Sequence, residues 1–365
     1  MSSVHKLESG RWQTRWRDPD GRTRKKSFDR KVDAEQHRVA VDHSILSGSY
    51  IDSRAGSVRF EDFAERWRAV QQHKPTTAEQ VETYLRRHAY PAFGDRPLNS
   101  LRPSEMQAWV AALAEVLAPS TVEVVVRHVS SVFKAAVLDR LIPSSPTQGI
   151  KLPKKEPREI VPLDVEQVRA IADAIQPRYG ALVVLMAATG IRPGEAFGLS
   201  NDRVDWLQRS IRVDRQLVTV GNVAQFGPPK TAASHRVIPV PDFILQRLSA
   251  HVREHPPGVH GLLFTNAKEE MIQRKRFGEV WRQTMKRLDF ECSGPHQLRH
   301  HYASLLIQHG ESVKVVQKRL GHASASETLD TYSHLWPDSE DSTRRAVEAA
   351  YATESAGKSQ LKGLH

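Results

Sequence analysis

Residues 187–195 read AATGIRPGE, a stretch that predicts a helix ending at Gly190 and a second helix beginning at Pro193. Arg192 is therefore expected at a sharp junction between the two helices. A guanidinium held beside a helix N-terminus suits a phosphate ligand, and Glu195 in the same turn can orient it. Taken alone, the stretch fits a purely structural pair of Arg192 and Glu195 equally well.

A second arginine lies in the stretch 295–300, which reads PHQLRH. Pro295 is typical of a helix start, and the three-residue spacing places His296 and Arg299 on one helix face. Fixed donors of this kind can hold both non-bridging oxygens of a phosphate and stabilise charge on pentacoordinate phosphorus. A histidine at a helix start and an arginine on the surface would explain the stretch without any chemistry.

A histidine and a tyrosine follow in the stretch 320–334, LGHASASETLDTYSH. Gly321 is typical of a helix C-terminus, so His322 is expected just beyond the helix. Tyr332 falls on a short helical segment, where a tyrosine is ordinarily half-buried packing. As a nucleophile it would need its phenol, with an ordinary pKa of about 10, eased toward phenolate by cations and a hydrogen-bonding partner such as His322.

A lysine with a possible chemical role lies in the stretch 226–231, FGPPKT, which is expected to form a turn between strands. From such a turn the long side chain of Lys230 can reach a bound substrate, which makes it a candidate general acid. Most loop lysines are simply solvated, so Lys230 by itself is weak evidence for a catalytic role.

The region around these stretches, residues 161–352, is predicted to be one mixed, mostly helical domain with a small β-sheet. A strand is expected over 210–220, with a turn at Gly221 and Asn222, and the strands 223–226 and 236–240 complete the β region. Helices are expected at 243–255, 272–288, 295–309, 313–320 and 339–351. The tail 353–365 is expected to be disordered.

Residues 57–150 are predicted to form a separate helical domain without strands. Thr76 with Thr77, and Ser120 with Thr121, resemble helix N-caps because each pair precedes a glutamate. The next ten residues, 151–160, contain two prolines and five charges and are predicted to be an extended linker. Its candidate DNA contacts are Lys151, Lys154 and Lys155.

The first 55 residues are predicted to form a small module, a three-stranded sheet covered by a helix over 32–46. Aromatic and polar residues alternate on both sides of the turn 18–21, DPDG, which is the pattern of a β-hairpin. The hairpin is rich in cations that could follow a phosphate backbone, although an ordinary solvated edge would look similar. These candidates are Arg15, Arg17, Arg22, Arg24, Lys25 and Lys26.

Length and composition agree with a multidomain protein that binds a polyanion, and the periodic stretches above make it mainly α-helical. The 365 residues suit two or three domains, and 53 Lys and Arg against 42 Asp and Glu give a net charge of +11. The single cysteine, Cys292, excludes an internal disulfide framework. Scattered carboxylates predict no metal site, and short apolar stretches predict a soluble, cytoplasmic protein.

The chain closely resembles the tyrosine recombinase, or phage integrase, family in the order and local sequence of six residues: Arg192, Lys230, His296, Arg299, His322 and Tyr332. The resemblance covers about residues 160–350. The helical region 57–150 looks like the core-type DNA-binding domain of that family, and residues 1–55 are similar to the arm-type DNA-binding domain of many phage integrases.

The resemblance implies a metal-free and ATP-free site-specific recombinase that integrates or excises a phage or another mobile element. Tyr332 would attack a scissile phosphate to form a 3′-phosphotyrosyl link and release a 5′-hydroxyl. Arg192, Arg299 and His322 would stabilise the phosphorane, Lys230 would protonate the leaving oxygen, and His296 would support acid–base transfer or contact the phosphate.

Partners are also implied by the resemblance. Four protomers would join two duplexes through a Holliday junction, and arm-type integrases commonly use an excision factor and a DNA-bending host protein. No cofactor is expected. In the family the segment after the tyrosine often packs onto a neighbouring protomer, and the helix predicted over 339–351 could do so or fold back on its own domain.

Two rival functions remain open from the residues. A type IB topoisomerase uses a similar set of side chains, but the added basic module at the N-terminus and the compact spacing resemble integrases more. A DNA-binding protein without catalysis is disfavoured by the presence of all six residues.

Overall fold

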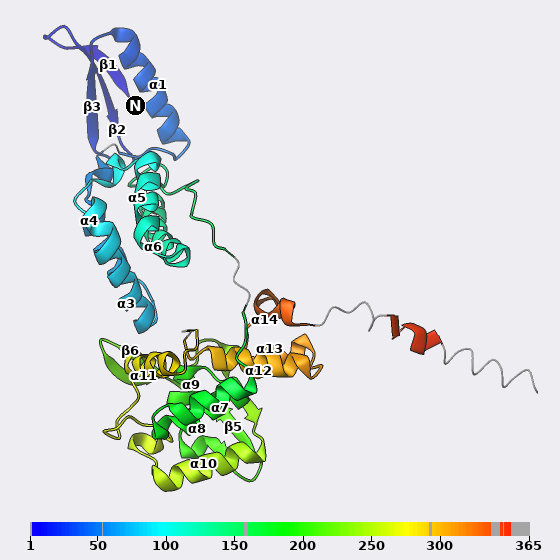
Figure 1. The fold of residues 1–365 in the computed structure, drawn as a ribbon. Helices are drawn as coiled ribbons and strands as arrows, with labels where there is room; N and C mark the ends of the chain where they lie inside the picture. Colours follow the sequence, from blue (N-terminus) through cyan, green and yellow to red (C-terminus); the bar gives the residue numbers. More distant parts are fainter. Residues whose placement is uncertain are drawn as a thin grey trace, which may run out of the picture. The chain divides into compact units, whose positions relative to one another are not determined.

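The computed structural model describes residues 2–52, 54–156, 160–291, 294–336, 344–345 and 347–351. The chain divides into two compact units, Met1–Glu156 and Pro157–His365. Figure 1 shows helices in both units and small sheets in each. Among the described residues, no helix is both long and apolar enough to cross a membrane.

The N-terminal unit begins with the predicted sheet and helix. Strands β1 (Ser3–Lys6), β2 (Trp12–Arg17) and β3 (Thr23–Phe28) pair antiparallel in the order β1-β2-β3, and α1 (Lys31–Leu46) lies against them (Figure 1). Thr14 on β2 is fully buried and donates a hydrogen bond of 2.8 Å to the Ala34 carbonyl, while the Trp16 ring lies 5.2 Å from that of His37 on α1. Because strand side chains alternate, one face of the sheet packs on α1 and the other is open.

The rest of the N-terminal unit is helical, as predicted. Its helices are α2 (Phe60–Ala69), α3 (Pro75–Tyr84), a π-helical turn at Leu85–Ala89, α4 (Tyr90–Phe93), α5 (Pro103–Val116) and α6 (Pro119–Leu138), with 3-10 turns at Ala55–Ser57 and Leu98–Ser100. Phe60, Phe93 and Phe133 form the centre of its core. The described stretch 54–156 contains no strand beyond one isolated bridge between Arg59 and Pro97.

The predicted N-caps of this region are wrong. Helix α3 begins at Pro75 and α6 at Pro119, so Thr76, Thr77, Ser120 and Thr121 lie inside the first turns, and no side chain caps either helix. Proline at the first helical position has no N–H to satisfy, which reduces the need for a side-chain acceptor.

The segment 151–156, in the region predicted to be a linker, has neither helix nor strand, and residues 157–159 lie outside the described part. Its start is held by Gln107 on α5, whose side-chain amide donates to the Lys151 carbonyl at 3.0 Å and accepts from the Lys151 N–H at 2.9 Å.

The C-terminal unit is mostly helical. Its helices are α7 (Val165–Ala174), α8 (Pro177–Thr189), α9 (Pro193–Phe197), α10 (Asp242–Glu254), α11 (Arg274–Arg287), α12 (Gln297–Gln308), α13 (Val313–Leu320) and α14 (Ala325–Tyr332), with 3-10 turns at Asn201–Arg203, Ala232–Ser234, Val259–Gly261 and Ser333–Leu335. Helix α8 is buried along most of its length, because α7, α10 and α12 pack around it. This buried helix therefore fixes the position of the junction that follows it.

The β region of this unit differs from the prediction in one respect. The strand expected over 210–220 is two strands, β5 (Ser210–Val213) and β6 (Gln216–Val220), in different sheets. Strand β5 pairs with β4 (Val204–Asp205) and β8 (Arg236–Pro239), and β6 pairs with β7 (Val223–Gly227). The bend is held by Arg215, which donates to the Gly198 carbonyl at 3.1 Å and to the Ser200 hydroxyl at 2.7 Å.

The end of the chain is described only in part. Of the helix predicted over Ser339–Tyr351, residues 344–345 and 347–351 are helical. The remaining residues of that helix, and the tail 353–365 that was predicted to be disordered, lie outside the described part.

Candidate active site

Arg192 lies at the helix junction that its sequence predicts. Helix α8 ends with Gly190 in the left-handed conformation, at φ +63°, and Arg192 is the residue immediately before α9. The Arg192 guanidinium donates to Glu195 Oε1 at 2.9 Å, to Ser234 Oγ at 3.0 Å and to the Gly321 carbonyl at 3.2 Å. Three separate segments thus hold this side chain, and Glu195 orients it as expected.

Glu195 holds a second arginine that sequence reasoning missed. Arg236 on β8 donates from Nη2 to Glu195 Oε2 at 2.9 Å, and its Nε donates to the Arg319 carbonyl at 2.9 Å. Burial alone would raise the pKa of the Glu195 carboxyl, but Arg236 and Arg192 hold that pKa below its ordinary value. No pattern in the sequence marks Arg236, because its partners come from two distant segments.

Arg299 on α12 is almost fully buried, with 1% of its surface exposed. Its Nη1 donates to the Gly190 carbonyl at 2.7 Å, while Nη2 has no hydrogen-bond partner among the described residues. Burial, together with Arg192 and Arg236, lowers the pKa of Arg299 to about 9. A buried guanidinium with an unused N–H is costly unless an anion completes its hydrogen bonds, and a phosphate has the charge and the acceptor oxygens to do so.

His296 lies one position outside the helix that was predicted to contain it. Helix α12 begins at Gln297, and His296 precedes it with an exposed side chain. Its ring lies 5.0 Å from that of His300, nearly perpendicular to it. His296 therefore borders the group of arginines from the solvent side.

His322 follows Gly321, which ends α13 in the left-handed conformation at φ +68°, as the sequence predicts. Its Nδ1 shares a hydrogen bond of 2.9 Å with Thr328 Oγ1 on α14. Burial, with Arg299 nearby, lowers the pKa of His322 to about 3. The ring is therefore neutral at neutral pH, and it stacks on Tyr332 at 6.4 Å with an angle of 8° between planes.

Tyr332 ends α14 and is buried, with 1% of its surface exposed. Its expected hydrogen-bond partner was His322, but the hydroxyl instead meets His300 Nδ1 at 2.8 Å. The expected easing toward phenolate is not found in the DNA-free protein, since burial raises the pKa of Tyr332 to about 12 even though Arg299 lowers it. His300 is four residues from His296, so helical spacing could have indicated that these two histidines share a face.

Lys230 is exposed on the loop between β7 and the turn Ala232–Ser234. The same loop leads to Ser234, which accepts a hydrogen bond from Arg192. This neighbouring serine connects the loop to Arg192, and the role of Lys230 as a general acid stays a prediction.

The basic candidates of the N-terminal sheet divide between its two faces. Arg15 on β2 lies opposite Lys25 on β3, and this pair shares the open face with Arg17. The remaining three occupy other positions: Arg22 in the turn, and Arg24 and Lys26 on the strand positions facing α1.

Two of the expected DNA contacts have acidic partners. Arg24 is paired with Asp18 at 2.9 Å and with Asp52. Lys155 in the linker is paired with Glu123 on α6. Lys151 and Lys154 are exposed.

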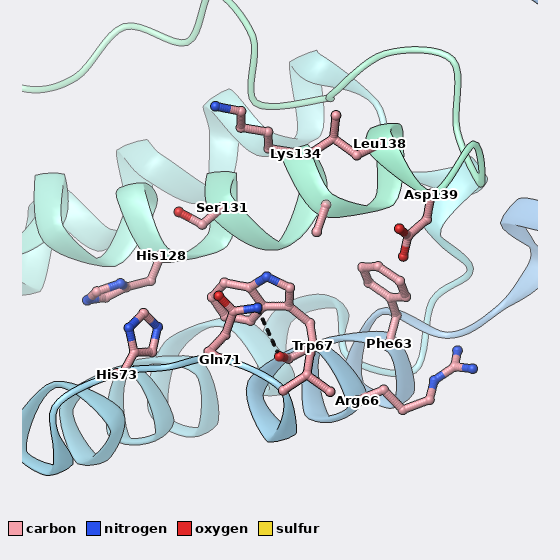
Figure 2. Close-up of a pocket in the computed structure, with 12 residues that line it drawn as sticks. Phe63, Arg66, Trp67, Gln71, His73, His128, Ser131, Lys134, Leu138 and Asp139 are labelled. Carbon is pink, nitrogen blue, oxygen red and sulfur yellow. Dashed lines mark hydrogen bonds between the residues drawn. The ribbon is translucent and has the colours of Figure 1, made fainter.

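A groove of about 720 Å³ lies between α2 and α6 in the N-terminal unit. Figure 2 shows Trp67 and Phe63 within it, and His73 and His128 on its opposite walls. Arg66 and Lys134 at its rim add positive charge. Aromatic and cationic side chains side by side suit a nucleic acid, although the groove contains none of the six candidate catalytic residues.

Arg192, Arg236 and Arg299 form one cluster beside Tyr332. Glu195 and three histidines, His296, His300 and His322, surround this cluster. Such an arrangement defines a class of protein that transfers phosphoryl groups through a covalent tyrosine link. Family models agree with this class. The model described as phage integrase family matches residues 162–338, the phage integrase N-terminal domain matches 2–47, and the phage integrase central domain matches 60–152. The chain belongs to the phage integrase family of tyrosine recombinases.

Relatives of similar length are integrases. The chain is 27% identical over 342 residues to a putative prophage phiRv2 integrase of Mycobacterium tuberculosis, covering 91% of this chain and 90% of the relative. It is 24% identical over 372 residues to the integrase of Mycobacterium phage D29, covering 96% and 97%. A tyrosine recombinase XerD of Corynebacterium glutamicum is 30% identical over 204 residues, covering 54% and 62%.

Solved structures agree in fold. The Tn1549 transposon integrase in complex with a circular intermediate DNA has a TM-score of 0.69 at 21% identity, covering 80% of this chain and all of that one. A lambda integrase dimer bound to a core site has a TM-score of 0.61 at 17% identity, covering 92% and 96%. The protein is a site-specific recombinase that cleaves and rejoins DNA, and the relatives favour neither a topoisomerase nor a non-catalytic DNA-binding protein.

Proposed function

We propose that this recombinase integrates or excises a phage or other mobile element through a 3′-phosphotyrosyl link between DNA and Tyr332. The observation that carries the proposal is the buried guanidinium of Arg299, which keeps an unused N–H next to Arg192, His322 and Tyr332. A scissile phosphate placed there would be held by two arginines in the way that a charged transition state requires.

The reaction proceeds by in-line displacement. The phenol oxygen of Tyr332 bonds to phosphorus as the bond to the 5′-oxygen breaks. Arg192, Arg299 and His322 stabilise the phosphorane, His296 contacts the phosphate from the solvent side, and Lys230 gives a proton to the leaving 5′-oxygen. Rejoining reverses these steps with a 5′-hydroxyl as the nucleophile, so the energy of the broken bond is kept in the phosphotyrosine.

The three segments have separate roles in DNA binding. Residues 1–55 bind arm sites through the open face of the sheet, where Arg15, Arg17 and Lys25 are not opposed by acidic side chains on the paired strand positions. Residues 57–150 bind core sites, and the aromatic and basic groove between α2 and α6 supports this assignment. Residues 161–352 form the catalytic domain.

The functional assembly is a homotetramer on two duplexes that passes through a Holliday junction. Support comes from a solved structure similar in fold, a lambda integrase tetramer bound to a Holliday junction, with a TM-score of 0.57 at 16% identity. An excision factor and a DNA-bending host protein assist the reaction, which takes place in the cytoplasm at the nucleoid.

The first test is covalent capture of DNA. The purified protein and its Tyr332→Phe variant are incubated, with a chelator present, with nicked duplexes from the flanks of the gene that encodes it. An adduct on a denaturing gel with the native protein only is expected. Adducts from both proteins would move the nucleophile to another residue, and specific binding without any adduct would leave a non-catalytic binder.

The second test concerns the N-terminal segment. Deleting residues 1–55 should abolish binding to arm sites and reduce recombination, while cleavage of a core-site duplex persists. Unchanged arm-site binding and recombination after the deletion would show that the arm-type assignment is wrong.

A further inference from the structure

The tyrosine nucleophile must lose its phenolic proton, and the structure brings one nitrogen within reach of it. Nδ1 of His300 lies 2.8 Å from the Tyr332 hydroxyl, and the two rings are 5.6 Å apart at an angle of 63°. A protonated phenol donates and a neutral imidazole nitrogen accepts, so this contact places the proton on the line along which it would be transferred.

The other two histidines of the site are directed elsewhere. His322 uses Nδ1 for Thr328, and its Nε2 faces Glu327 Oε1 at 3.8 Å. Its ring is parallel to that of Tyr332 at 6.4 Å, and among the described residues the hydroxyl of Tyr332 hydrogen bonds to His300 and not to His322. Among the described residues, the ring neighbour of His296 is His300, and His296 makes no hydrogen bond with Tyr332.

We propose that His300 is a catalytic residue, the general base that accepts the Tyr332 proton through Nδ1 during cleavage and returns it during rejoining. This inference rests on the proposed function and assigns a step that the proposed function leaves open. As the bond between the phenol oxygen and phosphorus forms, the O–H bond of Tyr332 breaks and its proton passes to His300. The bond between phosphorus and the 5′-oxygen breaks, and that oxygen takes a proton from Lys230.

The electrostatics of the site leave His300 in the protonation state that this role needs. Burial, with Arg299 adjacent, lowers the pKa of His300 to about 4, so the ring is neutral and can accept a proton at neutral pH. Burial raises the pKa of Tyr332 to about 12, so the phenol keeps its proton at neutral pH and needs a base when it attacks phosphorus. A phosphate bound at Arg299 would offset the positive charge that weakens His300 as a base.

Asparagine at position 300 separates the hydrogen bond from the base. Its amide occupies roughly the place of Nδ1 and can still hydrogen bond to the phenol, but it cannot take up the proton. His300→Asn should slow covalent adduct formation on nicked duplex by about 10²-fold or more while DNA affinity stays unchanged. The matched variant is His309→Asn at the exposed C-terminal end of the same helix, which should keep the native rate. An unchanged rate for His300→Asn, or an equal loss in both variants, would overturn the proposal.

A leaving group that needs no proton distinguishes a base from a structural residue. In the Tyr332→Phe background, a strand ending in a 3′-(p-nitrophenyl phosphate) is joined to a 5′-hydroxyl, with nitrophenolate leaving in place of tyrosine. Adding His300→Asn should leave this rate unchanged, whereas adding Arg299→Lys should reduce it. Equal losses from both additions would show that His300 acts on the phosphate or on the fold, and the proposal would fail.

The contact itself is tested without DNA, so this result does not depend on finding the recombination site. Nitrogen NMR of the His300 ring in the native protein should show Nδ1 without a proton, with a signal that shifts in Tyr332→Phe. A proton on Nδ1 in the native protein, or no shift in the variant, would overturn the proposal whether or not adducts form. Absence of adducts from the native protein with the NMR contact intact would count against the proposed function alone.

Discussion

Arg299 donates a hydrogen bond of 2.7 Å to the carbonyl oxygen of Gly190, 109 positions earlier in the chain. The bond joins α12, which contributes Arg299, to the junction that presents Arg192. Gly190 adopts φ +63°, and a Cβ there would collide with the ring of Tyr302. Gly190 therefore connects Arg299 directly to the junction that leads to Arg192.

Gly190→Ala should consequently destabilise the protein and impair cleavage together. The left-handed conformation costs an alanine about 1–2 kcal/mol, and the collision with Tyr302 adds to it. Gly221→Ala is the matched control, because Gly221 has φ +56° but open space around its Cβ. Urea denaturation should show the larger loss at position 190, and equal losses would mean that the close packing at Gly190 is unimportant.

Glu195→Gln should reduce stability far more than Glu105→Gln. Both carboxylates accept from an arginine and from a backbone N–H at a helix start, but Glu195 is buried and Glu105 is not. Removing the buried charge leaves Arg192 and Arg236 uncompensated, which costs about 3–5 kcal/mol, whereas an exposed pair contributes about 0–1 kcal/mol. Calorimetry of the two variants measures the difference, and similar values would contradict a structural role for Glu195.

Lys230→Ala should slow cleavage by about 10²- to 10⁴-fold if the lysine protonates the leaving oxygen. A substrate with sulfur in place of the 5′-oxygen should restore the rate, because a thiolate leaves without a proton. Lys268→Ala, another exposed loop lysine, should change neither rate. Failure of the sulfur substrate to rescue Lys230→Ala would assign Lys230 to binding instead.

Replacing Arg15, Arg17 and Lys25 by alanine should weaken arm-site binding and lower its salt dependence by roughly one unit per lost phosphate contact. Arg24→Ala should behave differently, because Arg24 is paired with the buried Asp18 and its loss destabilises the turn. Filter binding at several salt concentrations, with circular dichroism as a measure of folding, separates the two effects. A salt slope that falls only in Arg24→Ala would reverse the assignment of the two faces.

Acidification should destabilise the fold through His300 and His322. Their pKa values of about 4 and 3 lie below the ordinary 6.5, so the unfolded chain binds more protons between these limits and stability falls as pH drops below about 6.5. Each histidine contributes up to about 1.4 kcal/mol per pH unit there. Arg299, Arg192 and His296 are the charged or titratable neighbours of this pair. His300→Asn removes one of the two titrating groups and should therefore reduce the slope of unfolding free energy against pH. An unchanged slope would contradict the lowered pKa of His300.

Local stretches of sequence were sufficient for most of the secondary structure. Gly190 and Gly321 mark helix ends because glycine readily adopts the left-handed backbone conformation. Pro193 marks a helix start because proline has no N–H to satisfy there. The hairpin around Asp18 and the helices of 57–150 follow from side-chain periodicity in the same way. Prediction failed at 210–220, where the bend is held by hydrogen bonds from Arg215 to a segment that periodicity does not include.

The sequence by itself determined the family and six candidate residues, because the order and local setting of chemical groups are written along the chain. Only the tertiary structure decided which groups touch. It paired Tyr332 with His300 in place of His322, joined Arg236 to Glu195, and left Arg299 with an unused N–H. The physical reason is that hydrogen bonds and pKa shifts depend on distances of a few ångströms and on burial, which are set when distant helices pack around α8.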